Sequence, residues 1–334
     1  MLLREKQRQK FIGTVLTALL LLVNACGTPE RDNPYDPKSP RYRDTTVLEG
    51  TVVRFYPPFA PISSATVTLL PDSFSTKTDA AGRFQFPSVK VGSHRIAAAK
   101  EGFSGDTLNW EITLWGHQQP VLHLDALPRF EQVKIRTRHI SRWWPPDDLY
   151  FLEIRVILTD ADGPTDIAAA YFSFPDAAVA DTLLPGDQMN EFSKTIEQRD
   201  LPLTSLQELI GRPLFLYAND RAGYSSTSGP YYITRIIEEL ATPDSPKGLE
   251  TAPNPPVLHW IHSRGQYTYS YTAEIYRDDG GVVTRVWRQE GIPAATDSAR
   301  VQQPLSTGIY FWTVSVVDRF GNTGRSKEAA FRIE

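Results

Sequence analysis

The chain has 334 residues, of which 41% are hydrophobic and 22% charged, with 26 Pro, 21 Gly and a single Cys. This composition excludes a collagen, a coiled coil and a small disulfide-stapled protein, and at about 100 to 150 residues per domain the length allows two or three cores. The formal net charge is −4, and removal of the cationic first 25 residues would shift it to −7. An acidic chain offers no broad positive field to a phosphate backbone, so nucleic acid is not an expected partner.

The first 25 residues have the layout of an export signal. Basic residues precede Phe11–Val23, an uncharged apolar run of 13 residues. As a helix this run would span roughly 20 Å, which is too short to cross a membrane comfortably. The next residues, Val23-Asn24-Ala25-Cys26, resemble the lipobox of bacterial lipoproteins. The alternative is a plain signal peptide beside a chance Cys, but Cys26 has no second Cys to pair with, which favours the lipobox.

This resemblance implies a membrane anchor at Cys26. In bacterial lipoproteins the Cys carries covalent lipid, palmitate included, and the signal peptide, here residues 1–25, is removed. Because Gly27 and not an Asp follows the Cys, the resemblance also implies transport to the outer membrane. There the protein could face either the periplasm or the outside of the cell. Residues 26–44 contain four Pro and eight charged residues. Such a segment buries too little apolar surface to order itself and is predicted to be a disordered tether.

Residues 45–128 are predicted to form a β-sandwich, because short apolar runs alternate with turn signals along them. The sequence Thr-Asp-x-x-Gly-x-Phe-x-Phe occupies 78–86. Asp79 can cap a turn there, Gly82 can adopt a positive φ, and the two Phe enter one face of the following strand. With the preceding Gly-x-Val and Ala-x-Val-x-Leu strands, this pattern resembles the carboxypeptidase regulatory-like, or transthyretin-like, domain. The resemblance implies a seven-stranded sandwich without catalytic residues.

Residues 129–240 are predicted to form a second sandwich. Apolar residues alternate in the strand predicted at 151–158. Ser205 and Glu208 have the spacing of a capping box and predict one short helix. The sequence Tyr-Ala-Asn-Asp-Arg-Ala-Gly at 217–223 is similar to the final hairpin of bacterial immunoglobulin-like domains, which implies that fold for this module.

A linker rich in Pro and polar residues is predicted at 241–252, and a third sandwich at 253–334. The sequence Asp-Asp-Gly-Gly at 278–281 suits a tight hairpin. Trp260 and Tyr310 resemble the core Trp and the corner Tyr of fibronectin type III domains, which implies that Trp260 is buried and that Tyr310 makes a corner hydrogen bond. The predicted fold class is therefore all-β, with three tandem β-sandwich modules behind a lipoprotein signal and a flexible tether.

The sequence contains no Gly-x-Ser-x-Gly elbow, His-Glu-x-x-His, Cys-x-x-Cys or phosphate-binding glycine loop. We therefore predict a non-enzymatic binding, adhesion or scaffold protein of the cell envelope, whose partner is an envelope protein or a glycan. The alternative is an envelope hydrolase or polysaccharide-processing enzyme with its site in the middle module. Clustered carboxylates of perturbed pKa in a concave pocket would favour the enzyme, whereas an exposed flat aromatic patch would favour binding.

One loop of the middle module has the residues of a metal site. Asp160, Asp162 and Asp166 could supply carboxylate oxygens to Ca²⁺. The loop is similar to the start of the Asp-x-Asp-x-Asp-Gly calcium loop, but Gly163 comes too early and Tyr171 stands where that loop has its Glu. The alternative is a turn whose Asp side chains cap backbone amides. Apart from this ion and the lipid, no cofactor is expected.

Trp143 and Trp144 are the candidate ligand contacts. Neighbouring residues of an extended segment point to opposite sides, so one indole can fill a core while the other is presented to solvent. A presented indole stacks on sugar faces or on apolar partners. The alternative is that both pack in the core or between domains, since a Pro pair at 145–146 indicates a junction.

Overall fold

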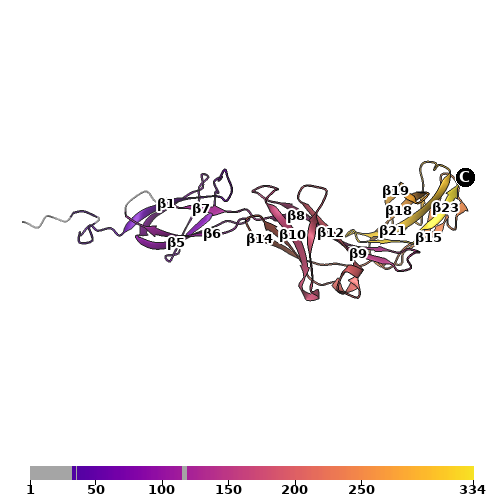
Figure 1. The fold of residues 1–334 in the computed structure, drawn as a ribbon, viewed down its shortest axis with the longest axis horizontal. Coiled ribbons are helices and arrows are strands. Elements are labelled where there is room, and N and C mark those ends of the chain that lie inside the picture. The colour runs from indigo at the N-terminus through magenta and orange to yellow at the C-terminus, as the bar shows by residue number, and fades with distance from the viewer. Residues whose placement is uncertain (1–31, 35, 115–118) are drawn as a thin grey trace, which may run out of the picture. The chain divides into compact units, whose positions relative to one another are not determined.

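The computed structural model describes residues 32–34, 36–114 and 119–334, so Cys26 and the lipobox lie outside the described residues. In those ranges the chain forms strands and three short 3₁₀ segments but no α-helix. It divides into two compact units (Figure 1). The first contains the described residues up to Glu101 and Gly105–Leu124, and the second contains Gly102–Ser104 and Asp125–Glu334. None of the helical segments in the described ranges is long and apolar enough to span a bilayer.

The first unit is a sandwich of two sheets built from seven described strands. In one sheet, β1 (Thr45–Arg54) pairs antiparallel with β4 (Arg83–Lys90) and parallel with β7 (Val121–Leu124). The strands of the other sheet are, in spatial order, β3 (Phe74–Lys77), β2 (Thr66–Leu70), β5 (Gly92–Ala99) and β6 (Asp106–Ile112). Side chains alternate across each strand, so Val52, Leu69 and Ile96 are fully buried in the core.

The turn before β4 confirms the local prediction. One carboxylate oxygen of Asp79 accepts hydrogen bonds of 2.8 Å from the backbone N–H groups of Ala81 and Arg83. Gly82 has a φ of +72°, and a Cβ at that position would lie 2.5 Å from the carbonyl oxygen of Val52. The turn therefore requires glycine both for its backbone conformation and for the close approach of β1.

The second unit contains two sandwiches with separate cores. The core of the first includes the fully buried side chains of Phe172, Leu214 and Leu216. Its strands, which lie in the spatial order β14-β13-β10-β11-β12-β9-β8, are β8 (Arg129–Ile140), β9 (Leu149–Thr159), β10 (Ile167–Phe174), β11 (Val179–Pro185), β12 (Glu191–Glu197), β13 (Leu214–Asp220) and β14 (Ser225–Tyr231).

The short helix predicted in this sandwich is the 3₁₀ segment η3 (Leu206–Leu209). The Ser205 hydroxyl accepts from the backbone N–H of Gln207 at 3.2 Å, and the Glu208 carboxylate accepts from the backbone N–H of Ser205 at 3.1 Å. Both leucines that bound the segment are fully buried. The capping box thus fixes where the turn begins, and burial of one apolar face holds it against the core.

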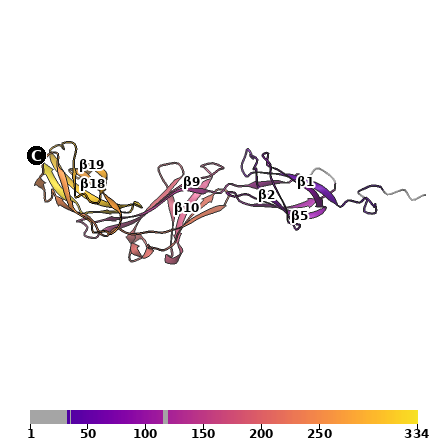
Figure 2. The same ribbon diagram turned by 180° about the vertical axis from the view of Figure 1, so that it is seen from behind.

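The second sandwich of this unit has its core around Tyr271, Trp312 and Phe331. Its strands are β15 (Thr242–Ser245), β16 (Glu250–Thr251), β17 (Val257–Ile261), β18 (Tyr269–Asp279), β19 (Val282–Pro293), β20 (Ser298–Arg300), β21 (Gly308–Asp318), β22 (Thr323–Arg325) and β23 (Ala329–Ile333). The long strands β18 and β19 form a hairpin and lie side by side in both views (Figure 1, Figure 2).

The aromatic residues singled out in this sandwich have the predicted roles. Trp260 is buried in the core, in edge contact with Tyr271. The Tyr310 hydroxyl donates a 2.6 Å hydrogen bond to the backbone carbonyl of Ser306. This bond ties the start of β21 to the loop before it, which is the corner bond of the fibronectin type III pattern.

A continuous sheet joins the two sandwiches of the second unit. β22 pairs in parallel with β8, with Thr323 opposite Arg138 and Arg325 opposite Ile140. Thirteen strands are thereby linked in one sheet, with β8 and β22 as the connection. The two cores are separate, but the backbone hydrogen bonding between them is not interrupted.

Residues 241–252, predicted as a linker, contain strands. β15 pairs with β17, β16 pairs with β23, and the Trp312 indole N–H donates to the carbonyl of Pro246 at 2.8 Å. The same Pro-rich composition that suits a linker also suits β15, because this strand lies at the edge of its sheet, where a missing N–H costs no ladder bond. In the predicted tether, the described residues form hydrogen-bonded turns, with the Arg43 N–H donating to the Pro34 carbonyl at 2.9 Å.

Candidate functional site

Five aspartates from three segments of the second unit converge on one place. We call them the acidic cluster: Asp125, Asp160, Asp162, Asp166 and Asp220. Asp125 precedes β8, Asp220 ends β13, and the other three belong to the loop between β9 and β10. One carboxylate oxygen from each of Asp125, Asp162 and Asp166 lies within 4.8 Å of the other two.

Most of this cluster is closed to solvent. The exposed fraction is 0% for Asp125, 6% for Asp166 and 3% for Asp220. Both carboxylate oxygens of Asp125 and one each of Asp160, Asp166 and Asp220 are buried without a hydrogen-bond donor. Among the described residues, these four aspartates form no ion pair with a Lys, Arg or His side chain. Buried carboxylate oxygens are nearly always satisfied, so this group of orphaned acceptors demands a positive partner.

The electrostatics of the cluster follow from burial and like charge. Burial, reinforced by contact with Asp220, raises the pKa of Asp125 to about 8. Burial also raises the pKa of Asp160 to about 6, against a hydrogen bond from the backbone of Asp162 that lowers it. Two ionised carboxylates cannot share a hydrogen bond, so Asp125 and Asp220 need either a proton or a cation between them.

The loop also forms the capped turn that was the alternative prediction. The Asp160 carboxylate accepts a 2.8 Å bond from the N–H of Asp162, and the Asp162 carboxylate accepts a 2.7 Å bond from the N–H of Ala126. Turn capping and convergence therefore coexist, because each carboxylate has more than one acceptor site. The sequence did not indicate Asp125 or Asp220 as members, since neither lies near the loop along the chain.

The structure presents both tryptophans to solvent, with exposed fractions of 65% for Trp143 and 82% for Trp144. Neither indole is therefore packed in a core, but Trp143 does contact the sandwich predicted at 253–334, as the alternative of packing between domains expects for one of the two. The Trp143 indole N–H donates to the carbonyl of Glu328 at 2.7 Å, and the Lys327 ammonium lies 4.5 Å from the centre of its ring. These two contacts hold Trp143 in one orientation.

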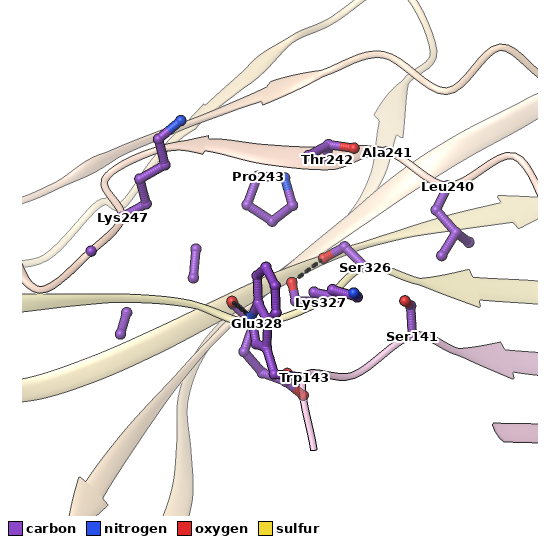
Figure 3. Close-up of a pocket in the computed structure, with 13 residues that line it drawn as sticks. Ser141, Trp143, Leu240, Ala241, Thr242, Pro243, Lys247, Ser326, Lys327 and Glu328 are labelled. Atoms are coloured by element: carbon purple, nitrogen blue, oxygen red, sulfur yellow. Dashed lines mark hydrogen bonds between the residues drawn. The ribbon is translucent and has the colours of Figure 1, made fainter. Parts of the chain in front are cut away.

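Trp143 borders a groove of about 780 Å³ in the second unit. Figure 3 shows its indole on one side of this space, with Pro243 across from it and Lys247 toward one end. The lining residues come from the segment after β8, from the segment that contains β15, and from the start of β23: Ser141, Trp143, Leu240, Ala241, Thr242, Pro243, Lys247, Gly248, Ser326, Lys327, Glu328, Ala329 and Ala330. The groove is mainly apolar, and its polar lining residues include Ser141, Thr242 and Lys247.

Ser141 on the groove has a His and an Asp near it, but they are not arranged as a nucleophilic triad. The Ser141 hydroxyl donates to Asp148 at 3.0 Å, and the other oxygen of Asp148 lies 2.8 Å from Nε2 of His139. Nδ1 of His139 faces the carbonyl of Ile237 at 2.8 Å. The imidazole therefore has no contact through which it could take the serine proton, which is what activates a nucleophile.

A known protein family matches most of the first unit. Residues 47–124 match the carboxypeptidase regulatory-like domain family. No curated protein matches the chain. The chain is similar to the fibronectin(III)-like modules of CbhA from Clostridium thermocellum, at 13% identity and a TM-score of 0.31, over 62% of this chain and 93% of that one.

Two further solved structures show comparable similarity. The chicken CNTN1 FN1–FN3 domains are 9% identical with a TM-score of 0.32, over 86% of this chain and 98% of that one. A DUF3823 family protein from Bacteroides ovatus is 11% identical with a TM-score of 0.26, over 57% of this chain and 98% of that one. Of these comparisons, the family match places a carboxypeptidase regulatory-like domain at residues 47–124.

Proposed function

We propose that this protein is a non-enzymatic glycan-binding protein of the cell envelope, held to the outer membrane by lipid on Cys26. The observation that carries the proposal is the groove beside Trp143, together with Trp144, the next residue of the chain, which is more than four-fifths exposed. Large aromatic side chains are costly to leave in water, and an exposed pair beside an apolar groove is typical of a recognition surface.

A glycan suits the groove because a sugar ring has an apolar face and a polar rim. The apolar face can stack on an indole, while the rim can bond to the hydroxyls of Ser141 and Thr242 and the ammonium of Lys247, which line the groove. Trp143 is already fixed by its bond to Glu328 and by Lys327. Little side-chain entropy is then lost when the ligand stacks, which favours binding.

The acidic cluster supports a binding role over the alternative hydrolase. Asp125 and Asp160 have raised pKa values, as catalytic acids do, but a general acid must come within hydrogen-bond reach of its substrate. Asp125, Asp166 and Asp220 are closed to solvent, so a polysaccharide could not reach them. The exposed aromatic patch, in contrast, is accessible.

The test is a glycan array probed with the whole chain from residue 26, made soluble by Cys26→Ser. We expect binding that Trp143→Ala and Trp144→Ala each weaken about five- to tenfold, the size of one lost aromatic contact. Phe74→Ala, which removes an exposed aromatic from the first unit, is the matched control and should leave binding unchanged. Binding that survives both Trp substitutions would contradict the site, and binding of envelope proteins alone would identify the partner as protein.

A further inference from the structure

We infer that the acidic cluster of the second unit is a calcium-binding site, formed by Asp125, Asp162 and Asp166 with Asp160 and Asp220 beside them. This inference is independent of the proposed glycan groove, which lies on other segments of the same unit. It adds Asp125 and Asp220, which are distant in the chain, to the predicted calcium loop at residues 160–166.

The first argument is the burial of oxygens that have no donor. Asp125 is fully buried, and neither of its carboxylate oxygens meets an N–H or O–H group. Asp166 and Asp220 are each more than nine-tenths buried, and each has one such oxygen. Unpaired buried charge is strongly unfavourable, so these side chains are explained only if something positive sits among them.

The second argument is that a single proton does not satisfy the group. A proton shared by Asp125 and Asp220 would serve one contact, but the orphaned oxygens of Asp160 and Asp166 would remain without a donor. A cation accepts several oxygens at once, and the 4.8 Å limit on the spread of the Asp125, Asp162 and Asp166 oxygens is the separation expected of ligands around one ion.

The third argument concerns which cation. Every side chain in the cluster offers a carboxylate, and none offers the imidazole or thiolate that zinc and other transition metals prefer. Mg²⁺ demands octahedral geometry and keeps several of its waters, which suits an open site better than a buried one. Ca²⁺ takes six to eight oxygens in irregular arrangements and loses its water readily.

The position of the ligands also explains why the loop departs from the calcium loop that it resembles. A continuous loop must supply all its ligands within about twelve residues, ending in a bidentate Glu. Here Asp125 and Asp220 come from segments before and after the loop. The site therefore does not need a Glu ligand at the position that Tyr171 occupies. An ion bound there would tie the start of β8, the β9–β10 loop and the end of β13 together.

The experiment measures thermal unfolding and calorimetric binding of the whole chain from residue 26, as Cys26→Ser, after chelator treatment. Titration with CaCl₂ should show one site per chain, and at a hundredfold excess over Kd it should raise the Tm of the second unit by about 5 °C or more. MgCl₂ at equal concentration should raise the Tm less. Absence of a Ca²⁺ response up to 10 mM, on the order of ten times the weakest affinities of extracellular calcium modules, would overturn the inference.

Two substitutions test whether the ion binds at the acidic cluster. Asp125→Asn and Asp166→Asn keep the side-chain shape but remove a charge, so the metal-free variants should fold, with less repulsion inside the cluster. Each should lower Ca²⁺ affinity at least tenfold. Asp187→Asn, which removes an exposed Asp of the same sandwich, is the matched control and should respond like the parent.

A Ca²⁺ response that is equal in the parent, in Asp125→Asn and in Asp166→Asn would place the ion elsewhere and overturn the inference. Trp143→Ala should retain the full Ca²⁺ response, so failure of the glycan proposal and failure of the calcium site are separate results. Glycan binding that persists in Asp166→Asn would likewise leave the two sites independent.

Discussion

The side-chain oxygen of Asn322 accepts a 2.9 Å hydrogen bond from the backbone N–H of Thr137, 185 residues earlier in the chain. Its amide nitrogen donates to Asp318 at 2.9 Å and to Thr234 at 3.2 Å, and Arg235 lies 3.2 Å from the same Asp318 carboxylate. One buried amide therefore connects strands of both sandwiches in the second unit, beside the backbone pairing of β22 with β8.

Asn322→Ala should destabilise the second unit by about 2 kcal/mol. The substitution leaves the N–H of Thr137 without its side-chain acceptor in a buried place and removes one of several donors to Asp318. One orphaned buried group costs roughly 1 to 3 kcal/mol. Urea unfolding followed by fluorescence would measure the loss. A change in free energy of unfolding below about 0.5 kcal/mol would show that the amide does not hold the two sandwiches together.

Tyr310→Phe should cost about 1 kcal/mol, since it removes only the hydroxyl that bonds to the carbonyl of Ser306. The ring stays stacked on Phe331, so the core volume is kept. Differential scanning calorimetry would measure the change in stability. Tyr276→Phe is the control, because it also removes a tyrosine hydroxyl, one that bonds to the side chain of Glu274. A loss of several kcal/mol would mean that the ring had moved, and no loss would contradict a structural role for the corner bond.

Acid should weaken the second unit through Asp148. Burial opposes ionisation of this carboxyl, but hydrogen bonds from His139 and Ser141 outweigh it and hold its pKa below the ordinary value. A lowered pKa in the folded state contributes stability that is present above the ordinary value near 4 and is lost as the pH falls through the folded pKa. Denaturant unfolding between pH 6 and pH 2.5 should show this decline, and Asp148→Asn should make the curve flatter. An unchanged slope in the variant would refute the assignment.

Cys26 should carry the lipid. The order of charged, apolar and small residues before it is that of a lipoprotein signal, and two or three acyl chains anchor a protein where one is marginal. Cells that express the full chain and take up labelled palmitate should label the parent but not Cys26→Ser, and the mature chain should begin at residue 26. Equal labelling of both proteins would end the lipobox interpretation.

The sequence was informative wherever the determinants are neighbours. Asp79 and Gly82 lie in one turn, Ser205 and Glu208 in one capping box, and Tyr310 bonds four residues back. In each case the backbone between the partners is short, so residue type alone decides the geometry.

Features that depend on distant segments could not be predicted in the same way. The loop Asp160, Asp162 and Asp166 was identified, but Asp125 and Asp220 join it only because the strands before and after it end at the same place. The groove beside Trp143 is likewise bordered by three segments, and one of them had the composition of a linker. Strand pairing brings these segments together, so the spacing of residues along the sequence does not reveal that they converge.

The parallel pairing of β8 with β22 also sets an order of events for a chain that is made from its N-terminus. β8 is complete at Ile140, but its neighbour on that side begins only at Thr323. Until β22 emerges, the middle sandwich exposes an unpaired strand that can add to any other strand nearby. Closing this contact across so long a separation is intrinsically slow. The edge of β8 therefore depends on β22 for its cover, and a chain cut short before β22 would be expected to aggregate through that edge.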